Sequence, residues 1–313
     1  MKLSIIIPCY NCSNTIERCL DSIGTNSNVA VILINDKSTD NTELIISKYI
    51  KHHPNNKYLL INNEKNLGAG ETRNIGLGFV NSDYFMFADS DDRFVSDYYE
   101  SIIRSLETYK SDCLIFDAWR LADGKERYFD MFFSDKIEEG YIDKRDAFVF
   151  VKGCPWCKVY STKVLINPNV RFANLKVNED LVFTKKAILQ CDKIFYLSKP
   201  LYMYEDVPTS LMHITKRDPS IYIDAYRMIE SEQIADYAEE LCAMYALEVI
   251  YPTLLYACTN KCNNLAIQEL SDKISVDYKN NKYIRQYNFK HRFVLKLIQY
   301  RLYIFIKLLL KLC

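Results

Sequence analysis

The sequence predicts an α/β fold with a mostly parallel sheet that is flanked by helices. In the first part of the chain, short apolar runs of strand length alternate with stretches of helix length. Strands and helices that alternate at this spacing form right-handed crossovers and a parallel sheet. Polar clusters follow the apolar runs, and such sheets bind ligands at the carboxyl ends of their strands. Together these observations indicate a sheet that holds a ligand.

The composition is that of a globular protein of 313 residues, with 49% hydrophobic and 26% charged residues. This length allows one large domain and a smaller one. A formal net charge of zero argues against nucleic acid as a partner of the whole chain. The eleven cysteines are irregularly spaced, which favours free thiols in a reducing cytosol. We find neither a signal peptide nor about 18 uncharged apolar residues in a row, so no membrane-spanning helix is expected.

Each element of the first part has its own local signal. Uninterrupted apolar runs predict buried strands at 3–7, 29–35, 58–61, 84–88 and 113–119. Helices are expected between these runs. Ser13 or Asn14 caps the first helix, and Ser38 or Thr39 caps the second. The stretch GETRNIGLGFV predicts a short third helix, and a fourth is expected at about 96–109.

The pattern loosens after about Asp123. A helix is predicted to start near Glu179, and KIFYLSKPLYMYEDVPTSLMH, residues 193–213, predicts a hairpin. Helical periodicity then continues to about Lys273. We therefore expect three units: an α/β domain at 1–215, a helical extension at 216–285 and a basic amphipathic helix at 286–313.

Three carboxylates, Asp89, Asp91 and Asp92, directly follow the apolar run YFMFA. Like charges repel at short range, and a buried carboxylate is costly unless it is paired. A hard divalent cation with oxygen ligands would offset this charge and bridge a diphosphate. The alternative is a solvated acidic turn that caps the next helix, with Asp92 near its N-terminus. An EF-hand loop is excluded because its sixth position is Phe94 and not glycine.

Five motifs occur in an order and spacing that resemble those of a known enzyme family. They are SIIIPCYNCSNTIERCLDSI, ILINDKSTDNT, NEKNLGAGETRNIGL, FADSDD and NEDLVF. Over roughly residues 1–215 the chain resembles the inverting nucleotide-sugar glycosyltransferases of family 2, of the bacterial surface-polysaccharide type. The resemblance implies the GT-A fold and a metal-dependent hexosyl- or N-acetylhexosaminyl-transferase. It also implies a UDP-sugar donor, a glycan or lipid-linked glycan acceptor, and Mn²⁺ or Mg²⁺ as cofactor.

The resemblance places the nucleotide at the ends of the first strands. It implies that Asp36 recognises uracil, whose N3–H can donate to a carboxylate, with Ser38 beside it. The family pattern is Asp-Asp-Gly-Ser, and this chain departs from it at Asn35 and Lys37. The alternative for NDKSTD is a helix-capping turn. The residues implied in donor binding are Pro8, Tyr10, Asn11, Asp36, Ser38, Lys65, Gly70, Arg73, Asp89 and Ser90.

The segment NLGAGETRN resembles the family's third nucleotide contact. Gly68 and Gly70 would let the backbone approach the ligand, and Arg73 would reach the base or the phosphates. A dinucleotide-binding loop is the alternative, because Gly-x-Gly follows a predicted strand and Asp89 lies about 20 residues farther on. That loop requires a third glycine where this chain has Arg73.

The same resemblance assigns metal binding and catalysis. Asp91 is the implied metal ligand, Asp89 is a ribose-side acid that also serves the metal, and His213 is a further ligand. An inverting transfer needs a base for the acceptor hydroxyl. The motif NEDLVF implies Asp180 in this role, with Glu179 as its neighbour. As alternatives, His213 is structural and the two acids only complement the helix dipole.

Three other functions are considered from the sequence: a redox or zinc protein, a catalytically silent subunit and a nucleotidyltransferase. The stretch CPWCKVY contains a Cys154-x-x-Cys157 pair, but it lacks a second pair for zinc and a thioredoxin-like context. Its Trp156 packs under the acceptor sugar or belongs to the core. A catalytically silent binding or scaffold subunit is a second function class, and the retained acids argue against it. A nucleotidyltransferase would need a glycine-rich basic loop after the first strand, which PCYNCSNT does not provide.

The C-terminal stretch 289–313 is basic and amphipathic. It contains six Lys or Arg residues and no acid, and its apolar residues, beginning with Val294 and Leu295, gather on one helical side. The pattern predicts a helix lying on the cytoplasmic face of the inner membrane, near lipid-linked acceptors. Basic residues interrupt the stretch, which disfavours a spanning helix. The alternative is a core-packing helix that closes the second domain.

Overall fold

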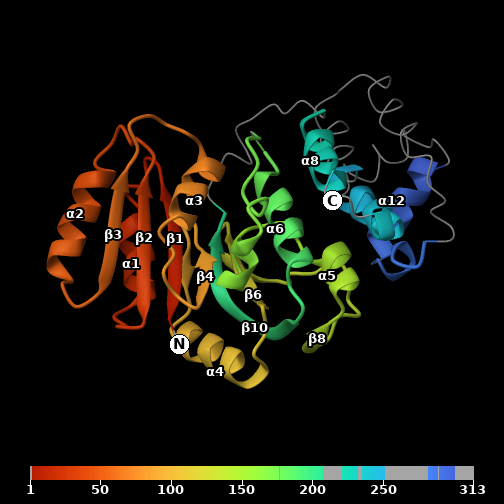
Figure 1. Cartoon of the computed structure of the whole chain (residues 1–313), viewed down its shortest axis with the longest axis horizontal. Helices are drawn as coiled ribbons and strands as arrows, with labels where there is room; N and C mark the ends of the chain where they lie inside the picture. The colour runs from red at the N-terminus through yellow and green to blue at the C-terminus, as the bar shows by residue number, and fades with distance from the viewer. Residues whose placement is uncertain are drawn as a thin grey trace.

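The structure is a computed structural model of the chain, in which residues 2–175, 177–206, 220–231, 235–250, 281–287 and 289–299 are described. Figure 1 shows a central sheet with helices around it, and the predicted α/β class is confirmed. The strand order is β3-β2-β1-β4-β9-β6-β10-β5, with β7 paired to β6 and β8 paired to β10.

The first half of the sheet is parallel, as the sequence predicts. Its strands pair β3 to β2, β2 to β1 and β1 to β4. These strands are β1 (Leu3–Cys9), β2 (Val29–Asn35), β3 (Lys57–Asn62) and β4 (Tyr84–Phe87). The connecting helices are α1 (Ile16–Ile23), α2 (Thr42–His52) and α3 (Ala69–Leu77). Parallel strands need such crossovers, so all three loops after β1, β2 and β3 emerge at one edge of the sheet.

The second half of the sheet is mixed. The predicted fifth strand is β6, and it runs parallel to β10 but antiparallel to β9. The strands of this half are β5 (Arg93–Phe94), β6 (Cys113–Ala122), β7 (Lys125–Phe129), β8 (Gly140–Ile142), β9 (Lys158–Ser161) and β10 (Ile194–Glu205). Three short strands, β7, β8 and β9, had no clear signal in the loosened pattern after Asp123.

The hairpin predicted at 193–213 is wrong within its described part. Residues Ile194–Glu205 form one strand that pairs with β6 along most of its length. Pro200 lies inside this strand, which absorbs it by a shift of register on either side. Such an irregularity is how a strand accommodates a residue that cannot donate a ladder hydrogen bond.

Helices cover the second half and continue beyond it. The α-helices are α4 (Tyr98–Tyr109), α5 (Lys144–Phe150), α6 (Glu179–Leu189), α8 (Ser220–Glu230), α9 (Ala238–Met244) and α12 (Phe289–Gln299). Short helical turns are η1 (Thr162–Ile166), η2 (Ala235–Tyr237) and η4 (Ile284–Gln286), and η3 (Tyr245–Ile250) is a π-helix. In Figure 1, α8 and α12 lie at the opposite end of the molecule from β1, β2 and β3. The division at residues 215 and 285 stays a prediction.

The described part of the basic C-terminal stretch is α12. Val294 and Leu295 belong to the hydrophobic core, as the core-packing alternative predicts, whereas Phe289 is 74% and Phe293 41% exposed. Residues 300–313 of the predicted surface helix lie outside the described residues. Among the described residues, no helix is long and apolar enough to cross a bilayer.

The third helix packs directly on the parallel strands. Gly76 of α3 is buried, and a Cβ atom at this position would lie 2.5 Å from Ile6 of β1 and 2.8 Å from Ile34 of β2. Neither isoleucine is free to move within the packed core. The missing side chain therefore sets how closely α3, which carries site residues, approaches the sheet.

We expect Gly76→Ala to destabilise the fold by about 1–3 kcal/mol, because overpacking forces the core to shift. Urea unfolding measures this change. Gly78→Ala is the matched control, since Gly78 is exposed at the end of the same helix with an ordinary backbone conformation. The control should remain within about 0.5 kcal/mol of wild type. Equal midpoints for Gly76→Ala and wild type would contradict this account of α3 packing.

Candidate active site

The loops after β1 and β2 are joined by side chains that the sequence singled out. The backbone N–H of Asn11 donates to the hydroxyl of Ser38 at 3.1 Å. In return, the side-chain oxygen of Asn11 accepts from the backbone N–H of Thr39 at 2.8 Å. Asn11 also has a positive φ of 49°, a conformation that asparagine tolerates better than most residues. Two predicted donor-binding residues, Asn11 and Ser38, thus form one rigid edge of the site.

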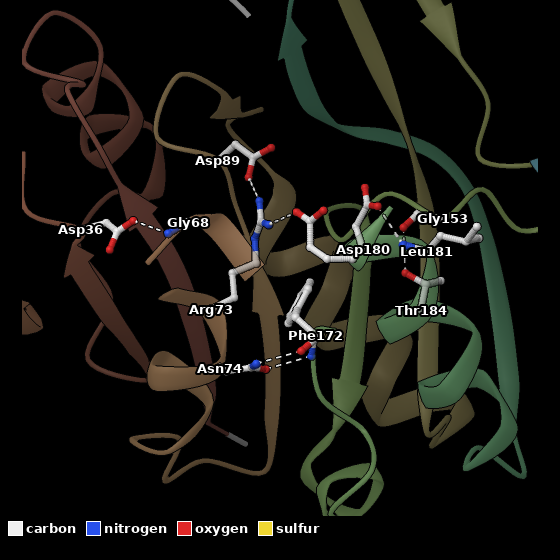
Figure 2. Close-up of polar contacts among 11 residues, drawn as sticks. Asp36, Gly68, Arg73, Asn74, Asp89, Gly153, Phe172, Asp180, Leu181 and Thr184 are labelled. Carbon is white, nitrogen blue, oxygen red and sulfur yellow. Dashed lines mark hydrogen bonds and ion pairs between the residues drawn. The ribbon is translucent and has the colours of Figure 1, made fainter. Parts of the chain in front are cut away.

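Asp36 is buried beneath this edge and already accepts three hydrogen bonds. One oxygen accepts from the Asn63 side chain at 2.8 Å and from the Leu67 N–H at 2.9 Å. The other accepts from the Gly68 N–H at 2.8 Å (Figure 2). A carboxylate has about four lone-pair positions, so the oxygen bonded to Gly68 can accept one more donor. Asp36 therefore organises the loop before α3, and uracil recognition by it stays a prediction.

The departure from the family pattern at Lys37 has a structural consequence. Lys37 has a φ of 58°, in the left-handed region that favours glycine. The family pattern has glycine at this position of the turn. Here the exposed lysine occupies it at a cost of about 1 kcal/mol, and the turn shape is kept by Asn35, whose side-chain oxygen accepts from the Ser38 N–H.

Arg73 of α3 lies at the centre of the site. One guanidinium nitrogen is 2.7 Å from Asp89, and the other is 3.6 Å from Glu179 (Figure 2). Burial alone would lower the pKa of Arg73, but the two carboxylates outweigh it and raise the pKa. Arg73 was predicted to serve the donor site. In the structure it also contacts Glu179, the acid next to the predicted base.

Other residues of α3 hold the same neighbouring segment. Asn74 donates to the carbonyl of Phe172 at 2.9 Å and accepts from its N–H at 2.8 Å. A Cβ atom on Gly70 would lie 2.8 Å from Cγ and 3.3 Å from Cβ of Glu179. Glycine at position 70 therefore makes room for Glu179 in this structure, which is a reason for it besides the approach of a ligand.

The acidic loop after β4 is electrostatically strained. Burial and the nearby charge of Asp89 raise the pKa of Asp91 to about 6. The pKa of Asp92 is also raised, first by burial and then by Asp89 and Asp91. One oxygen of Asp92 accepts from the Glu205 N–H at 2.8 Å, while the other is buried without a hydrogen-bond partner. Asp92 is thus not the solvated turn residue of the alternative reading.

These acids fit a divalent cation in their chemistry. Burial and the negative charge of Asp89 raise the pKa of Asp91, a charge that a cation would offset, and Asp89 keeps one oxygen that Arg73 does not engage. No group of three or more Asp, Glu, His or Cys side chains forms a metal site among the described residues. Asp91 and Asp89 would therefore hold the cation together with ligand oxygens. His213, the third predicted ligand, lies outside the described residues.

Sequence reasoning missed the residues that anchor this loop. Glu205, at the end of β10, is buried and pairs with Arg18 at 2.7 Å and Arg93 at 2.9 Å. Arg18 also donates to the carbonyl of Asp91 at 2.7 Å. The N–H of Asp89 donates to the hydroxyl of Tyr202 at 3.0 Å. No local pattern signals these contacts, because their partners are far apart in the sequence.

The predicted base begins helix α6. Asn178 precedes it with a φ of 62°, and this left-handed turn directs the chain into the helix. The Leu181 N–H donates to one oxygen of Asp180 at 2.8 Å. Burial and the adjacent charge of Glu179 raise the pKa of Asp180 to about 7, although Arg73 acts in the opposite direction. A carboxylate with such a pKa is a stronger base than an ordinary aspartate.

The rest of α6 is held by contacts of Thr184 and Lys185 with neighbouring segments. The hydroxyl of Thr184 donates to the carbonyl of Gly153 at 3.0 Å (Figure 2). Buried Lys185 donates to the carbonyl of Val151 at 2.6 Å and pairs with Glu248 of η3 at 3.3 Å. Glu248 comes from the predicted helical extension, so that part of the chain helps to hold the helix of the base.

The CPWCKVY stretch is structural in its described contacts. Trp156 is only 6% exposed and stacks on Tyr202 and Tyr204 at 5.4 and 5.3 Å, so it belongs to the core. Burial raises the pKa of Cys154 to about 11 and raises that of Cys157 as well. Thiols with raised pKa values are poor nucleophiles at neutral pH. The redox reading of this pair has no support in the structure.

The remaining predicted donor residues lie around the same edge of the sheet. Tyr10 follows β1 and is 49% exposed, so its ring is available to a ligand. Lys65 is exposed on the loop before α3, Pro8 is half-buried in β1, and Ser90 is half-buried in the acidic loop. Their roles in nucleotide binding stay predictions.

Comparison with known proteins identifies the family. The profile described as Glycosyl transferase family 2 matches residues 4–167. This chain belongs to glycosyltransferase family 2. Its α/β fold is that of the solved relatives, as the resemblance implied. The matched range contains all of the parallel half of the sheet and the acidic loop.

Two relatives illustrate the similarity. Glycosyltransferase GlyA of Streptococcus pneumoniae is 28% identical over 68% of this chain and 32% of its own length. TarS of Staphylococcus aureus, a poly(ribitol-phosphate) β-N-acetylglucosaminyltransferase, is 28% identical over 65% of this chain and 35% of its own. The structure of TarS 1–349 with UDP-GlcNAc superposes with a TM-score of 0.68, covering 88% of this chain and 83% of that one at 23% identity.

A more distant structure shares the fold. The mannosyltransferase PcManGT of Pyrobaculum calidifontis, solved with GDP-Man and Mn²⁺, is 15% identical with a TM-score of 0.56. The superposition covers 98% of this chain and 86% of PcManGT.

The sequence alignments with GlyA and TarS span about a third of each relative's length, so the reactions of these relatives are properties of longer proteins.

We expect Gly70→Ala to lower kcat about ten- to a hundredfold with little change in the dissociation constant for UDP. The added Cβ displaces Glu179 and the start of α6, and small misplacements of a catalytic group have effects of this size. Transfer kinetics and UDP titration measure the two quantities separately. Gly78→Ala is the control on the same helix. Weaker UDP binding with unchanged kcat would show that Gly70 faces the nucleotide instead.

Proposed function

We propose that this protein is an inverting glycosyltransferase that moves a hexosyl or N-acetylhexosaminyl group from a UDP-sugar to a hydroxyl of a glycan or lipid-linked glycan. The family membership supports sugar transfer. The observation that carries the proposal is that the guanidinium of Arg73 pairs with two acids. One is Asp89 of the acidic loop after β4, here called the donor loop, and the other is Glu179 beside the proposed base. Donor acids and base are thus held in one site, as transfer between two substrates requires.

Uridine is the proposed nucleotide. One oxygen of Asp36 retains acceptor capacity, which suits the N3–H of uracil, and Tyr10, which follows β1 and is exposed, offers a ring face. The relative TarS has been solved with UDP-GlcNAc. Because that similarity is 23% in sequence identity, we transfer the nucleotide only as a proposal.

The chemistry falls to Asp180. As a carboxylate it accepts the proton of the acceptor hydroxyl while that oxygen attacks the anomeric carbon from the face opposite to the leaving UDP. Burial and the adjacent charge of Glu179 raise the pKa of Asp180 to about 7, which makes it a competent base near neutral pH. A divalent cation, when bound near Asp91 and Asp89, supplies Lewis-acid stabilisation of the leaving diphosphate.

A binding or scaffold subunit is the alternative function. The raised pKa values of Asp91 and Asp180 weigh against it, because perturbed acids within one site are typical of catalysis. An assay of UDP release from UDP-GlcNAc and UDP-glucose, with and without a glycan acceptor, separates the two. Release above background supports the enzyme. Nucleotide binding with no release from either donor would support the scaffold.

We expect UDP with Mn²⁺ to raise the melting temperature of the protein, and GDP or dTDP to raise it less. Asp91→Ala should abolish the metal-dependent part of the UDP shift, because a cation ligand is lost and the diphosphate then meets Asp89 and Asp92. Asp135→Ala is the control, since Asp135 is exposed on a distant loop. Stabilisation by GDP but not UDP would overturn the uridine assignment. An unchanged UDP shift in Asp91→Ala would remove Asp91 from the metal site.

We expect Asp180→Asn to retain UDP binding and to lose about 10²–10⁴ in transfer rate, the usual cost of removing a general base. The amide oxygen can still accept from the Leu181 N–H, so the start of α6 is preserved. Asp192→Asn controls for charge, because Asp192 is largely exposed at the far end of α6. Near-normal turnover of Asp180→Asn would mean that another group takes the proton.

We also propose that the basic C-terminal stretch binds anionic membrane surfaces. Each Lys or Arg near such a surface contributes about 1 kcal/mol. The full chain should sediment with phosphatidylglycerol vesicles at low salt, less so at moderate salt, and not with neutral vesicles. A chain that ends at Gln299 keeps the core contacts of Val294 and Leu295 and should stay in the supernatant. Equal sedimentation of the two chains would contradict this proposal.

A further inference from the structure

One face of α3 is devoted to the segment that leads into α6. Gly70, Arg73 and Asn74 are spaced i, i+3 and i+4, so they lie on the same side of the helix. Gly70 packs closely against Glu179, and Arg73 forms an ion pair with Glu179. Asn74 forms two hydrogen bonds with the backbone of Phe172. Figure 2 shows Arg73 and Asn74 directed from α3 toward this segment. Only Arg73 also reaches the donor loop.

We propose that Arg73 is a positioning residue of the transfer step, which ties the start of α6 to the donor loop by sharing its guanidinium between Glu179 and Asp89. The inference rests on the role of Asp180 proposed above. Asp180 follows Glu179 directly in the helix, so a fixed Glu179 fixes the base relative to the donor. The resemblance implied a nucleotide contact for Arg73, and the pairing with Glu179 gives it a different task.

The geometry explains why this residue is arginine. Asp89 pairs with one terminal nitrogen and Glu179 with the other, so a planar fork spans the gap between two carboxylates. A lysine ammonium is a single point of charge and does not reach both acids in this way. The ring of Phe172 lies 5.4 Å from the guanidinium carbon and supports its orientation. Burial keeps water from replacing either carboxylate.

Charged groups from three elements act on Asp180 in this arrangement. Glu179 from its own helix and Glu248 from η3 favour the protonated carboxyl, whereas Arg73 from α3 favours the carboxylate. Cys154, on the loop before β9, is close enough to be affected by Asp180 itself. Removing Arg73 should therefore raise the pKa of Asp180, and neutralising Glu179 should lower it. These shifts report whether the charges of Arg73 and Glu179 act on Asp180, and kcat then reports whether the fork of Arg73 positions it.

The test is a carbon NMR titration of protein labelled at the aspartate side-chain carboxyls. The Asp180 resonance is the one absent from Asp180→Asn. Relative to wild type, Arg73→Met should move the titration midpoint up by about one pH unit and Glu179→Gln should move it down, as expected for charges within a few ångströms. Asn74→Ala is the matched control, because it removes a tether to the same segment without changing charge. Its midpoint should equal that of wild type.

Arg73→Lys separates charge from geometry. It should return the midpoint of Asp180 toward wild type but leave kcat low, since the fork that spans both acids is lost. The proposal is overturned if Arg73→Met and Glu179→Gln shift the midpoint in the same direction or not at all. It is also overturned if Arg73→Lys restores full kcat. The titration needs no turnover, so a wild-type protein that releases no UDP overturns the proposed function while the NMR result still decides on Arg73.

Discussion

The shared ion pairing of Arg73 is the constraint on which the rest of the site depends. A guanidinium removed from water must be paired, and here both partners come from other elements: Asp89 follows β4, and Glu179 starts α6. The pairing places the edge of the parallel half-sheet against a helix that lies far away in the sequence. Loss of both acids would leave the buried guanidinium without a charged partner, so the three residues form one unit.

Packing beneath this unit fixes its geometry. Phe172 stacks on Phe183 of α6 at 4.3 Å and meets Phe87 of β4 edge-on at 5.1 Å. Aromatic contacts of this kind add to the burial of large apolar surfaces. On the other side of α6, the buried pair of Lys185 and Glu248 links the helix to η3. Asp180, the proposed base, is therefore held both by the parallel half of the sheet and by the helical part beyond residue 215.

The sequence predicted the parallel half of the fold because its signals are local. Buried strands such as Leu3–Cys9 and Val29–Asn35 are continuous apolar runs, and each polar loop directly follows its strand. The mixed half was harder. The strand β9 is four residues long and pairs between β4 and β6, which no local pattern announces. The stretch around β10 was predicted to be a hairpin, yet pairing with β6 on both sides of Pro200 keeps it one strand.

The candidate site shows the same division. Asp36, Arg73, Asp91 and Asp180 lie at motif positions that a single sequence reveals. Their actual partners were not predictable, because contacts such as Arg73 with Glu179 or Asp92 with the Glu205 N–H join residues more than 100 positions apart. Resemblance to a family gives the roles of individual residues. Only the folded chain shows that the guanidinium of Arg73 pairs with both Asp89 and Glu179. It also shows that the glycine at position 70 leaves room for Glu179.

The central claim is that Asp180, which directly follows the Arg73-paired Glu179 in α6, is the base of a sugar transfer from a UDP-linked donor. Its most direct test is the pH dependence of kcat/KM for UDP-sugar turnover by the wild-type protein, since this quantity reports the pKa of the free enzyme's essential base. With the pKa of Asp180 raised to about 7, activity should fall tenfold per unit as the pH decreases below that value. Activity that stays constant down to about pH 4, where an ordinary aspartate titrates, would contradict the account.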